Sequence, residues 1–254
     1  MAREGKTSKW GWLSKLFAWR SNKNGGRVVA EKYMEQAWNA PHYKKSANGL
    51  GKNSVLKVAA ICGSLSTTAN NLGLINAATE IAKESISGME IELLDLSGIP
   101  LLNPDLITDD VYPDAVVTFR KKLQEADCVL FATPEYVYSV SGVLKNALDW
   151  ASLSPNVMGG KPAAVMTAAG DLGGARAQYH LRQMGVYLDL QFVNKPEVFV
   201  KAYSSPKKFD ENGNLIDTDV KASVKELLLG LQSLATKLLS SRACGPRESF
   251  SMVV

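Results

Sequence analysis

The chain has 254 residues, of which 46% are apolar and 21% are charged, so it can bury the core of one large domain. It contains no run of about 18 apolar residues and no apolar core of a secretory signal, so we expect a soluble or peripheral protein in the cytoplasm or an organelle. Its three cysteines, Cys62, Cys128 and Cys244, form no C-x-x-C pair and have no histidine nearby, which argues against a disulfide framework and a zinc site.

The first 53 residues differ from the rest in charge and composition. They carry eleven Lys or Arg against three Glu, a net charge of +8, whereas the remaining residues sum to −4. Four of the five tryptophans also lie there. We therefore divide the chain into a basic, Trp-rich N-terminal extension (1–53), one large domain (54–240) and a C-terminal tail (241–254).

Within the extension, residues 9–20 read KWGWLSKLFAWR and place Trp10, Leu13, Leu16 and Phe17 at helical spacing with cations between them. This pattern is typical of a basic amphipathic helix, although a targeting segment has a similar composition. We expect it to dock on a protein partner or a membrane surface, and we favour a protein because tryptophans are common interface anchors. No nucleic-acid role is expected, because the rest of the chain is net negative and lacks a known binding motif.

After residue 54, short apolar segments alternate with segments whose apolar residues have helical spacing. The predicted strands are 55–61, 91–96, 128–133 and 162–168, with a last strand region between Leu188 and Val200. The predicted helices are 72–86, 113–126, 142–153, 174–187 and 219–240. This alternation predicts a parallel sheet with helices on both faces, which binds ligands beyond the carboxyl ends of its strands.

A polar loop, ICGSLSTTANN at 61–71, follows the first predicted strand. Gly63 permits a tight turn, and the helix that follows presents unpaired N–H groups and the positive end of its dipole. Hydroxyls and amides there can hold a phosphate without a fixed cation, although an ordinary polar turn that caps a helix has the same composition. The two common nucleotide-binding loops, G-x-G-x-x-G and G-x-x-x-x-G-K-[ST], are both absent from the sequence. The loop at 61–71 therefore fits a site for the phosphate of flavin mononucleotide (FMN) better than a dinucleotide or P-loop site.

Several further segments, in this order along the chain, carry a family resemblance. They are GSL (63–65), TPEYVYSVSGVLKNALDWAS (133–152), GKPAAVMTA (160–168), GGARAQYHLRQMGVYLDL (173–190) and NKPE (194–197). The chain resembles the NADPH-dependent FMN reductase family over residues 54–240, and looks most like plant-type NAD(P)H:quinone oxidoreductases and bacterial chromate or quinone reductases. The resemblance implies an α/β, flavodoxin-like fold with a five-stranded parallel sheet in the order 2-1-3-4-5.

The resemblance also implies the chemistry and the site. FMN would take a hydride from NAD(P)H and pass two electrons to a quinone or another small acceptor, so the protein needs no catalytic residue of its own. The first loop would surround the FMN phosphate and the loop at 134–137 would border the flavin ring. The implied cofactor-binding residues are Ser64, Leu65, Ser66, Thr67, Thr68, Asn70, Asn71, Pro134, Glu135, Tyr136, Val137, Thr167 and Ala168.

Four positions depart from the family pattern. Ser66 stands where an arginine is expected, Ala69 and Ala168 where serines are expected, and Val137 where an asparagine is expected. A charge-assisted hydrogen bond contributes roughly 1.5–3 kcal/mol and a neutral one about 0.5–1.5 kcal/mol, so these losses together weaken FMN binding by a few powers of ten. The alternative function is therefore a flavin-free or weakly binding family member that serves as a structural subunit, docked through the extension.

Self-association is a further implication of the resemblance, because the family commonly forms dimers or tetramers. The segment GGARAQYHLRQ places Arg176, Tyr179, His180 and Arg182 on a helix that looks exposed. We interpret His180 as a packing or subunit-contact residue rather than a catalytic one. The sequence thus predicts a homo-oligomer or a subunit of a complex.

Overall fold

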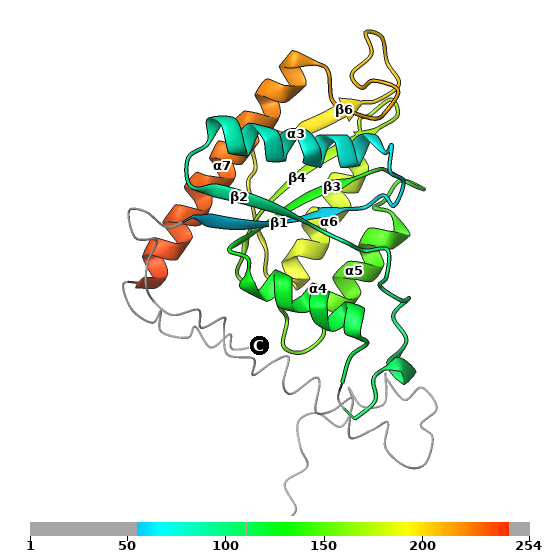
Figure 1. Ribbon diagram of the computed structural model, residues 1–254, viewed down its shortest axis with the longest axis vertical. Helices are drawn as coiled ribbons and strands as arrows, with labels where there is room; N and C mark the ends of the chain where they lie inside the picture. The colour runs from blue at the N-terminus through cyan, green and yellow to red at the C-terminus, as the bar shows by residue number, and fades with distance from the viewer. Residues whose placement is uncertain (1–54, 110, 244–254) are drawn as a thin grey trace, which may run out of the picture.

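The computed structural model describes residues 55–109 and 111–243 (Figure 1). The strands are β1 (Leu56–Cys62), β2 (Met89–Leu94), β3 (Cys128–Thr133), β4 (Pro162–Ala169), β5 (Gln191–Phe192) and β6 (Val198–Lys201). The helices are α3 (Asn70–Ser85), α4 (Asp114–Glu125), α5 (Gly142–Ser152), α6 (Ala175–Tyr187) and α7 (Thr218–Ala243), with a short 3-10 turn, η1 (Pro104–Leu106). The N-terminal extension and residues 244–254 lie outside the described part.

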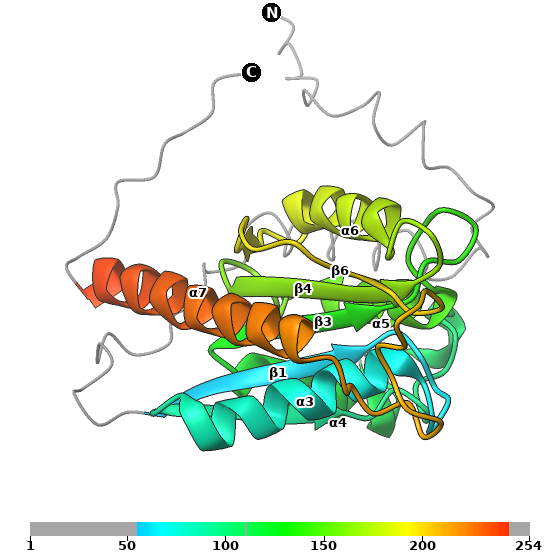
Figure 2. The same ribbon diagram turned by 90° about the horizontal axis from the view of Figure 1, so that it is seen from above.

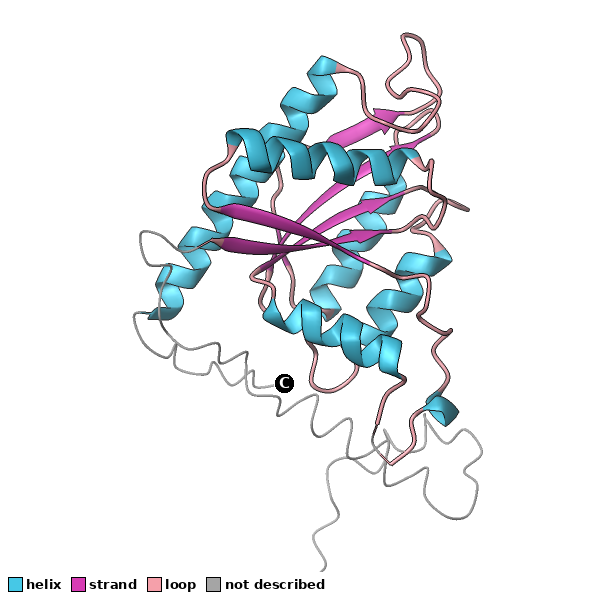
Figure 3. Ribbon diagram, in the orientation of Figure 1, coloured by secondary structure: helices cyan, strands magenta, loops and turns pink. Residues whose placement is uncertain are grey.

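All strand pairs of the described sheet are parallel, and the order is β2-β1-β3-β4-β5 (Figure 3). The predicted order 2-1-3-4-5 is therefore confirmed. Parallel pairing puts the carboxyl ends of β1, β3 and β4 side by side at one end of the sheet, where a doubly wound fold binds its ligand.

The single closing strand that we expected between Leu188 and Val200 is corrected to two short strands, so the sheet has six strands rather than five. β5 pairs with the start of β4, through Pro162 and Ala163, whereas β6 pairs with its end. Pro196 lies between them and has no N–H to donate to a ladder, which gives a physical reason for the interruption.

Helices cover both faces of the sheet, as predicted, because alternate side chains of each strand enter two different cores. Leu56, Val58 and Ala60 of β1 pack with α3 and α7, whereas Ala59 and Ile61 pack with α4, α5 and α6. β3 and β4 are buried along their whole lengths, which explains why their sequences are uninterrupted apolar runs.

The last helix, α7, lies beside α3 on one face of the sheet (Figure 2). Its buried stripe includes Val224, Leu227 and Leu231, in agreement with the predicted helical periodicity. The helix continues to Ala243, three residues beyond the predicted end at 240. None of the described helices combines the length and hydrophobicity that a bilayer span requires.

Candidate functional site

The loops that follow β1 and β3 touch one another at the carboxyl end of the sheet. The backbone N–H of Gly63 donates to the carbonyl of Ala132 at 2.8 Å, and the hydroxyl of Ser141 donates to the carbonyl of Gly63 at 2.6 Å. Segments 63–71 and 134–137 therefore lie together at one end of the sheet, as predicted. This shared end is where the site is expected.

A glycine is required at position 63 by this close approach. A Cβ atom there would lie 2.6 Å from Oγ1 of Thr133 and 2.9 Å from Oγ of Ser141, both far inside normal contact. A larger residue would push the two loops apart.

Just before this glycine, burial raises the pKa of the Cys62 thiol, so it stays protonated and is no nucleophile.

The first loop ends at the uncapped N-terminus of α3. The residue before the helix is Ala69, which has no side chain to bond the first N–H groups, so these groups and the positive end of the dipole face the loop. Ser66, Thr67 and Thr68 are exposed there, and the Ser66 hydroxyl accepts a bond from the Thr68 N–H at 3.4 Å. Free helix N–H groups beside hydroxyls fit a phosphate, without a lysine or arginine in the loop.

Asn71, one of the predicted cofactor ligands, has a packing role. Its side chain is 3% exposed, donates to the carbonyl of Ala168 and accepts from the N–H of Ala168, each at 2.9 Å. This pair of hydrogen bonds ties the first turn of α3 to β4 and satisfies the backbone N–H and C=O of Ala168. Asn71 and Ala168 therefore fix the end of the first loop to β4. A direct contact of either residue with flavin stays a prediction.

The second loop contains a tight turn in an unusual conformation. Tyr136 and Ser139 exchange two backbone hydrogen bonds of 2.9 Å, and the two residues between them, Val137 and Tyr138, have φ values of 49° and 62°. Positive φ at both central positions is the signature of a type I′ turn, which favours asparagine and glycine. A β-branched residue is strained there, and Val137 is 99% exposed, so packing does not compensate the strain.

Replacing Val137 with asparagine is expected to stabilise the domain by about 1 kcal/mol, because asparagine tolerates the left-handed region. Thermal unfolding should show a melting temperature roughly 2–4 °C higher. Val137→Thr, which keeps the branch at Cβ, is the matched control and should show no gain. An equal rise in both variants would contradict the strain argument.

The second loop is held against α6 by charged and aromatic contacts. The Glu135 carboxylate accepts from the Arg176 N–H at 3.0 Å and from its guanidinium at 2.9 Å, so it caps the helix and forms an ion pair. The guanidinium carbon of Arg176 also lies 4.0 Å from the centre of the Tyr138 ring. Nδ1 of His180 lies 3.0 Å from the Ser139 hydroxyl. These contacts fix the position of the second loop, and they place Arg176 near the expected position of the flavin ring.

Thr167, another predicted ligand, is fully buried at the end of β4. Its hydroxyl donates to the carbonyl of Gly173 at 2.6 Å and receives a hydrogen bond from the Gln178 side chain at 3.1 Å. Gly174 approaches it so closely that a Cβ atom would lie 2.5 Å from Cβ of Thr167. The hydroxyl therefore holds the start of α6 in place, and its contact with a cofactor stays a prediction.

A hairpin near residues 209–215, which the sequence reasoning missed, covers the first loop. Gly213 has a φ of 80°, and a Cβ atom on it would lie 2.3 Å from the carbonyl oxygen of Thr68. Hydrogen bonds from the side chain and backbone of Asn214, and from the backbone of Asn212, hold the pKa of the Asp210 carboxyl below its usual range. The Asn-Gly pair at 212–213 is a turn signal that could have revealed this hairpin.

Ser141 is a second missed residue. It is the N-cap of α5 and accepts a hydrogen bond from the Leu144 N–H at 3.2 Å, while its own hydroxyl reaches Gly63. A serine directly before an apolar-periodic segment is a recognised helix-start signal, so the cap could have been predicted. Its second bond, across the sequence to the first loop, has no local signal.

Comparison with known proteins identifies the family. The family model of the NADPH-dependent FMN reductases matches residues 56–204. The chain belongs to this family. Among the similar proteins, the NAD(P)H:quinone oxidoreductase of Solanum tuberosum is 56% identical over 184 residues, which are 72% of this chain and 95% of the relative. The NADPH:quinone oxidoreductase of Arabidopsis thaliana is 51% identical over 184 residues, 72% of this chain and 94% of the relative.

A solved structure has the same fold as the described domain. The flavoenzyme NAD(P)H:(acceptor) oxidoreductase FerB of Paracoccus denitrificans superposes with a TM-score of 0.61 at 27% identity, over 74% of this chain and 98% of FerB. The parallel order and the helices on both faces are those of the predicted flavodoxin-like fold. The family resemblance seen in the sequence is therefore confirmed.

Proposed function

We propose that this FMN reductase family member is an FMN-dependent NAD(P)H:quinone, or flavin, oxidoreductase. The observation that carries the proposal is the uncapped N-terminus of α3, which faces a loop of exposed hydroxyls. That loop begins at Gly63, which is bonded to Ala132 and Ser141 on either side of the loop after β3. The family match and the names of the relatives from Solanum tuberosum and Arabidopsis thaliana support the same activity. When bound, FMN supplies the hydride and electron transfer between NAD(P)H and the acceptor.

The chain's own residues bind and orient the cofactor. The N–H groups at the start of α3 and the hydroxyls of Ser66, Thr67 and Thr68 hold the phosphate through neutral hydrogen bonds and the helix dipole. The loop from Pro134 to Val137 borders the ring with backbone groups, and the Glu135 carboxylate holds that loop against α6 through its bonds to Arg176. Asn71 and Ser141 keep the two loops in register with the sheet.

The departures from the family pattern set the affinity rather than the fold of the site. The described loops keep their close contact although Ser66, Ala69 and Val137 replace the family residues. What is missing is a cation for the phosphate, a hydroxyl beside it and an amide near the ring. We therefore expect FMN binding that is weaker than in relatives with the full pattern, and less sensitive to salt.

A visible spectrum of the purified protein, followed by titration with FMN, tests the proposal. We expect flavin absorption, quenching of FMN fluorescence on binding, and NADPH-dependent quinone reduction. Restoring the family residues in the triple variant Ser66→Arg, Ala69→Ser and Val137→Asn should tighten FMN binding roughly 100- to 10,000-fold, because one charge-assisted and two neutral hydrogen bonds are added. Absence of FMN binding by the unmodified chain would favour the flavin-free structural subunit instead.

The partners of the protein follow from the same proposal. The acceptor is a quinone or another small molecule, and α6 offers a surface for self-association or for a complex. On this helix Tyr179, Val186 and Tyr187 are 50%, 83% and 78% exposed, which is unusual for large apolar side chains on a helix. Residues 9–20 lie outside the described part, so their docking on a protein or membrane surface stays a prediction. A location in the cytoplasm or an organelle likewise stays a prediction.

A further inference from the structure

The hairpin at 209–215, between β6 and α7, is built firmly into the domain. Phe209 and Leu215 pair across it and are only 5% and 4% exposed, because they belong to the core that α3 and α7 share. Beside its base, the Lys208 ammonium pairs with the Asp217 carboxylate, which also caps the first turn of α7. The stem of the hairpin is therefore held by both apolar and charged contacts.

One carboxylate shapes the tip of the hairpin. Asp210 accepts hydrogen bonds from the N–H of Asn212 at 2.9 Å, from the N–H of Asn214 at 2.8 Å and from the side-chain amide of Asn214 at 2.9 Å. The backbone of Asp210 also donates to the carbonyl of Asn214 at 3.0 Å and accepts from the N–H of Gly213 at 3.1 Å. All of these bonds lie within residues 210–214, so the tip has a defined shape of its own.

The tip of the hairpin lies against the first loop and the start of α3 (Figure 2). A Cβ atom on Gly213 would lie 2.3 Å from the carbonyl oxygen of Thr68, and a Cβ atom on Gly73 would lie 1.8 Å from the carbonyl oxygen of Gly213. Both contacts join backbone to backbone, so rotation of a side chain cannot relieve them. The tip therefore fixes the position of the peptide group that follows Thr68.

The orientation of this peptide group decides where the N–H groups of the loop point. In a planar trans peptide the C=O and N–H point in opposite directions, and the Thr68 carbonyl is directed at the hairpin. The N–H of Ala69 donates to the carbonyl of Ser66 at 3.2 Å, and the N–H of Gly73 donates to the carbonyl of Ala69 at 3.0 Å. The N–H groups of residues 70–72, which have no carbonyl of a preceding helical turn to bond, are left for an anion.

The hairpin tip acts on the phosphate end of the proposed site, because the second loop is fixed by different contacts. These are the bonds of Glu135 to Arg176 and the contact between His180 and Ser139. We propose that the hairpin is a positioning element for the flavin phosphate and that Asp210 holds it in place, so that the site prefers FMN to riboflavin, which lacks the phosphate. This inference rests on the proposed function.

Position matters more than charge at this end of the site. Residues 61–71 contain no lysine or arginine, so an anion there depends on neutral N–H and O–H donors, whose hydrogen bonds weaken steeply when they are misaligned. The Asp210 carboxylate is negative, so on charge alone its removal would strengthen the binding of an anion. A loss of FMN affinity on removing this carboxylate therefore reports positioning, because charge predicts the opposite sign.

Binding of FMN and of riboflavin to the full-length protein, each measured by fluorescence quenching, tests the proposal. Asp210→Ala should weaken FMN binding roughly tenfold and change riboflavin binding by less than about twofold, because the lost bonds shape only the phosphate end. Asp210→Asn keeps an acceptor oxygen for the N–H groups of the tip, so its FMN affinity should stay within about threefold of the unmodified protein. Equal weakening of both flavins, or no weakening for FMN, would overturn the proposal.

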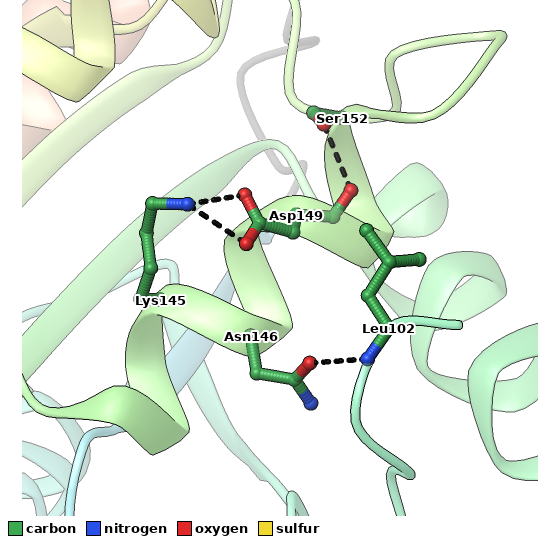
Figure 4. Close-up of polar contacts among 5 residues, drawn as sticks. All are labelled: Leu102, Lys145, Asn146, Asp149 and Ser152. Atoms are coloured by element: carbon green, nitrogen blue, oxygen red, sulfur yellow. Dashed lines mark hydrogen bonds and ion pairs between the residues drawn. The ribbon is translucent and has the colours of Figure 1, made fainter. Parts of the chain in front are cut away.

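Asp149→Ala is the matched control. Asp149 is partly exposed on α5, which covers the opposite face of the sheet from α3, and its carboxylate pairs with Lys145 at 2.6 and 2.8 Å (Figure 4). The substitution removes the same charge away from the hairpin, so the affinities for both flavins should be unchanged. A loss of FMN affinity equal to that of Asp210→Ala would mean that the hairpin is not its source and would overturn the proposal.

Hydrogen exchange of the flavin-free protein gives a second measurement that does not need the cofactor. The N–H groups of Ala69 and Gly73 are hydrogen-bonded in the segment that the hairpin supports. Asp210→Ala should speed their exchange roughly tenfold, whereas Asp149→Ala should not. Unchanged exchange in Asp210→Ala would overturn the positioning role. If the unmodified protein binds neither flavin, the proposed function fails together with the phosphate assignment, and the exchange comparison still decides whether the hairpin orders the loop.

Discussion

Replacing Asn71 with leucine is expected to destabilise the domain by about 4 kcal/mol, because the substitution leaves a buried N–H and a buried C=O without partners. Both groups belong to Ala168, which is 4% exposed near the carboxyl end of β4, so water has little access to replace the lost bonds. Leucine has the same number of side-chain heavy atoms as asparagine and a larger volume, so the substitution leaves no cavity. Thermal unfolding should show a melting temperature roughly 8–16 °C lower.

Asn76→Leu is the control for this change. Asn76 lies on the same helix but is exposed, so the same substitution should alter the melting temperature little. Asn71→Leu should also weaken FMN binding, because it loosens the first turn of α3, which forms the phosphate end of the proposed site. A stability loss no larger than that of Asn76→Leu would show that the two hydrogen bonds between the Asn71 side chain and Ala168 do not stabilise the domain.

The second large effect is expected at Gly73, on the first turns of α3. A Cβ atom at this position would lie 1.8 Å from the backbone carbonyl oxygen of Gly213. Backbone cannot rotate away as a side chain can, so Gly73→Ala must displace the hairpin at 209–215 or the helix. We expect a loss of about 3 kcal/mol in the free energy of unfolding, measured by denaturant titration.

Gly142→Ala makes the same chemical change where there is room. Gly142 is the first residue of α5, and no atom lies within 4 Å of a Cβ built there. Alanine restricts the unfolded chain and favours the helix, so this variant should gain about 0.5–1 kcal/mol. The pair therefore predicts effects of opposite sign. A loss of stability at both positions would contradict the contact argument at Gly73.

The fold could be predicted closely because its signals are local and repeated. Apolar runs such as 128–133 and 162–168 are typical of buried strands in a covered parallel sheet, and the structure places them there. The order of the strands came from the family resemblance rather than from periodicity. The break between β5 and β6 was missed because the whole region from 188 to 200 looks like one extended segment.

The site was predicted less completely, because the partner of a polar side chain is often far away in the sequence. The loops at 63–71 and 134–137 were identified, and their contact follows from parallel strand order. The amide of Asn71, however, bonds a residue 97 positions away, and no local pattern distinguishes such a structural amide from a ligand. The strain at Val137 was equally hidden, since it depends on a turn type that the valine itself does not favour.

The contact at Gly63 has a consequence for the energetics of ligand capture. The first loop begins at Gly63, which is hydrogen-bonded to Ala132 just before the second loop and to Ser141 just after it, so the two loops are tied together at their bases. A ligand that spans both loops then loses little conformational entropy of the protein when it binds, since the geometry is already assembled. We therefore expect discrimination between ligands to depend on the exposed side chains of the two loops, such as Ser66 and Val137.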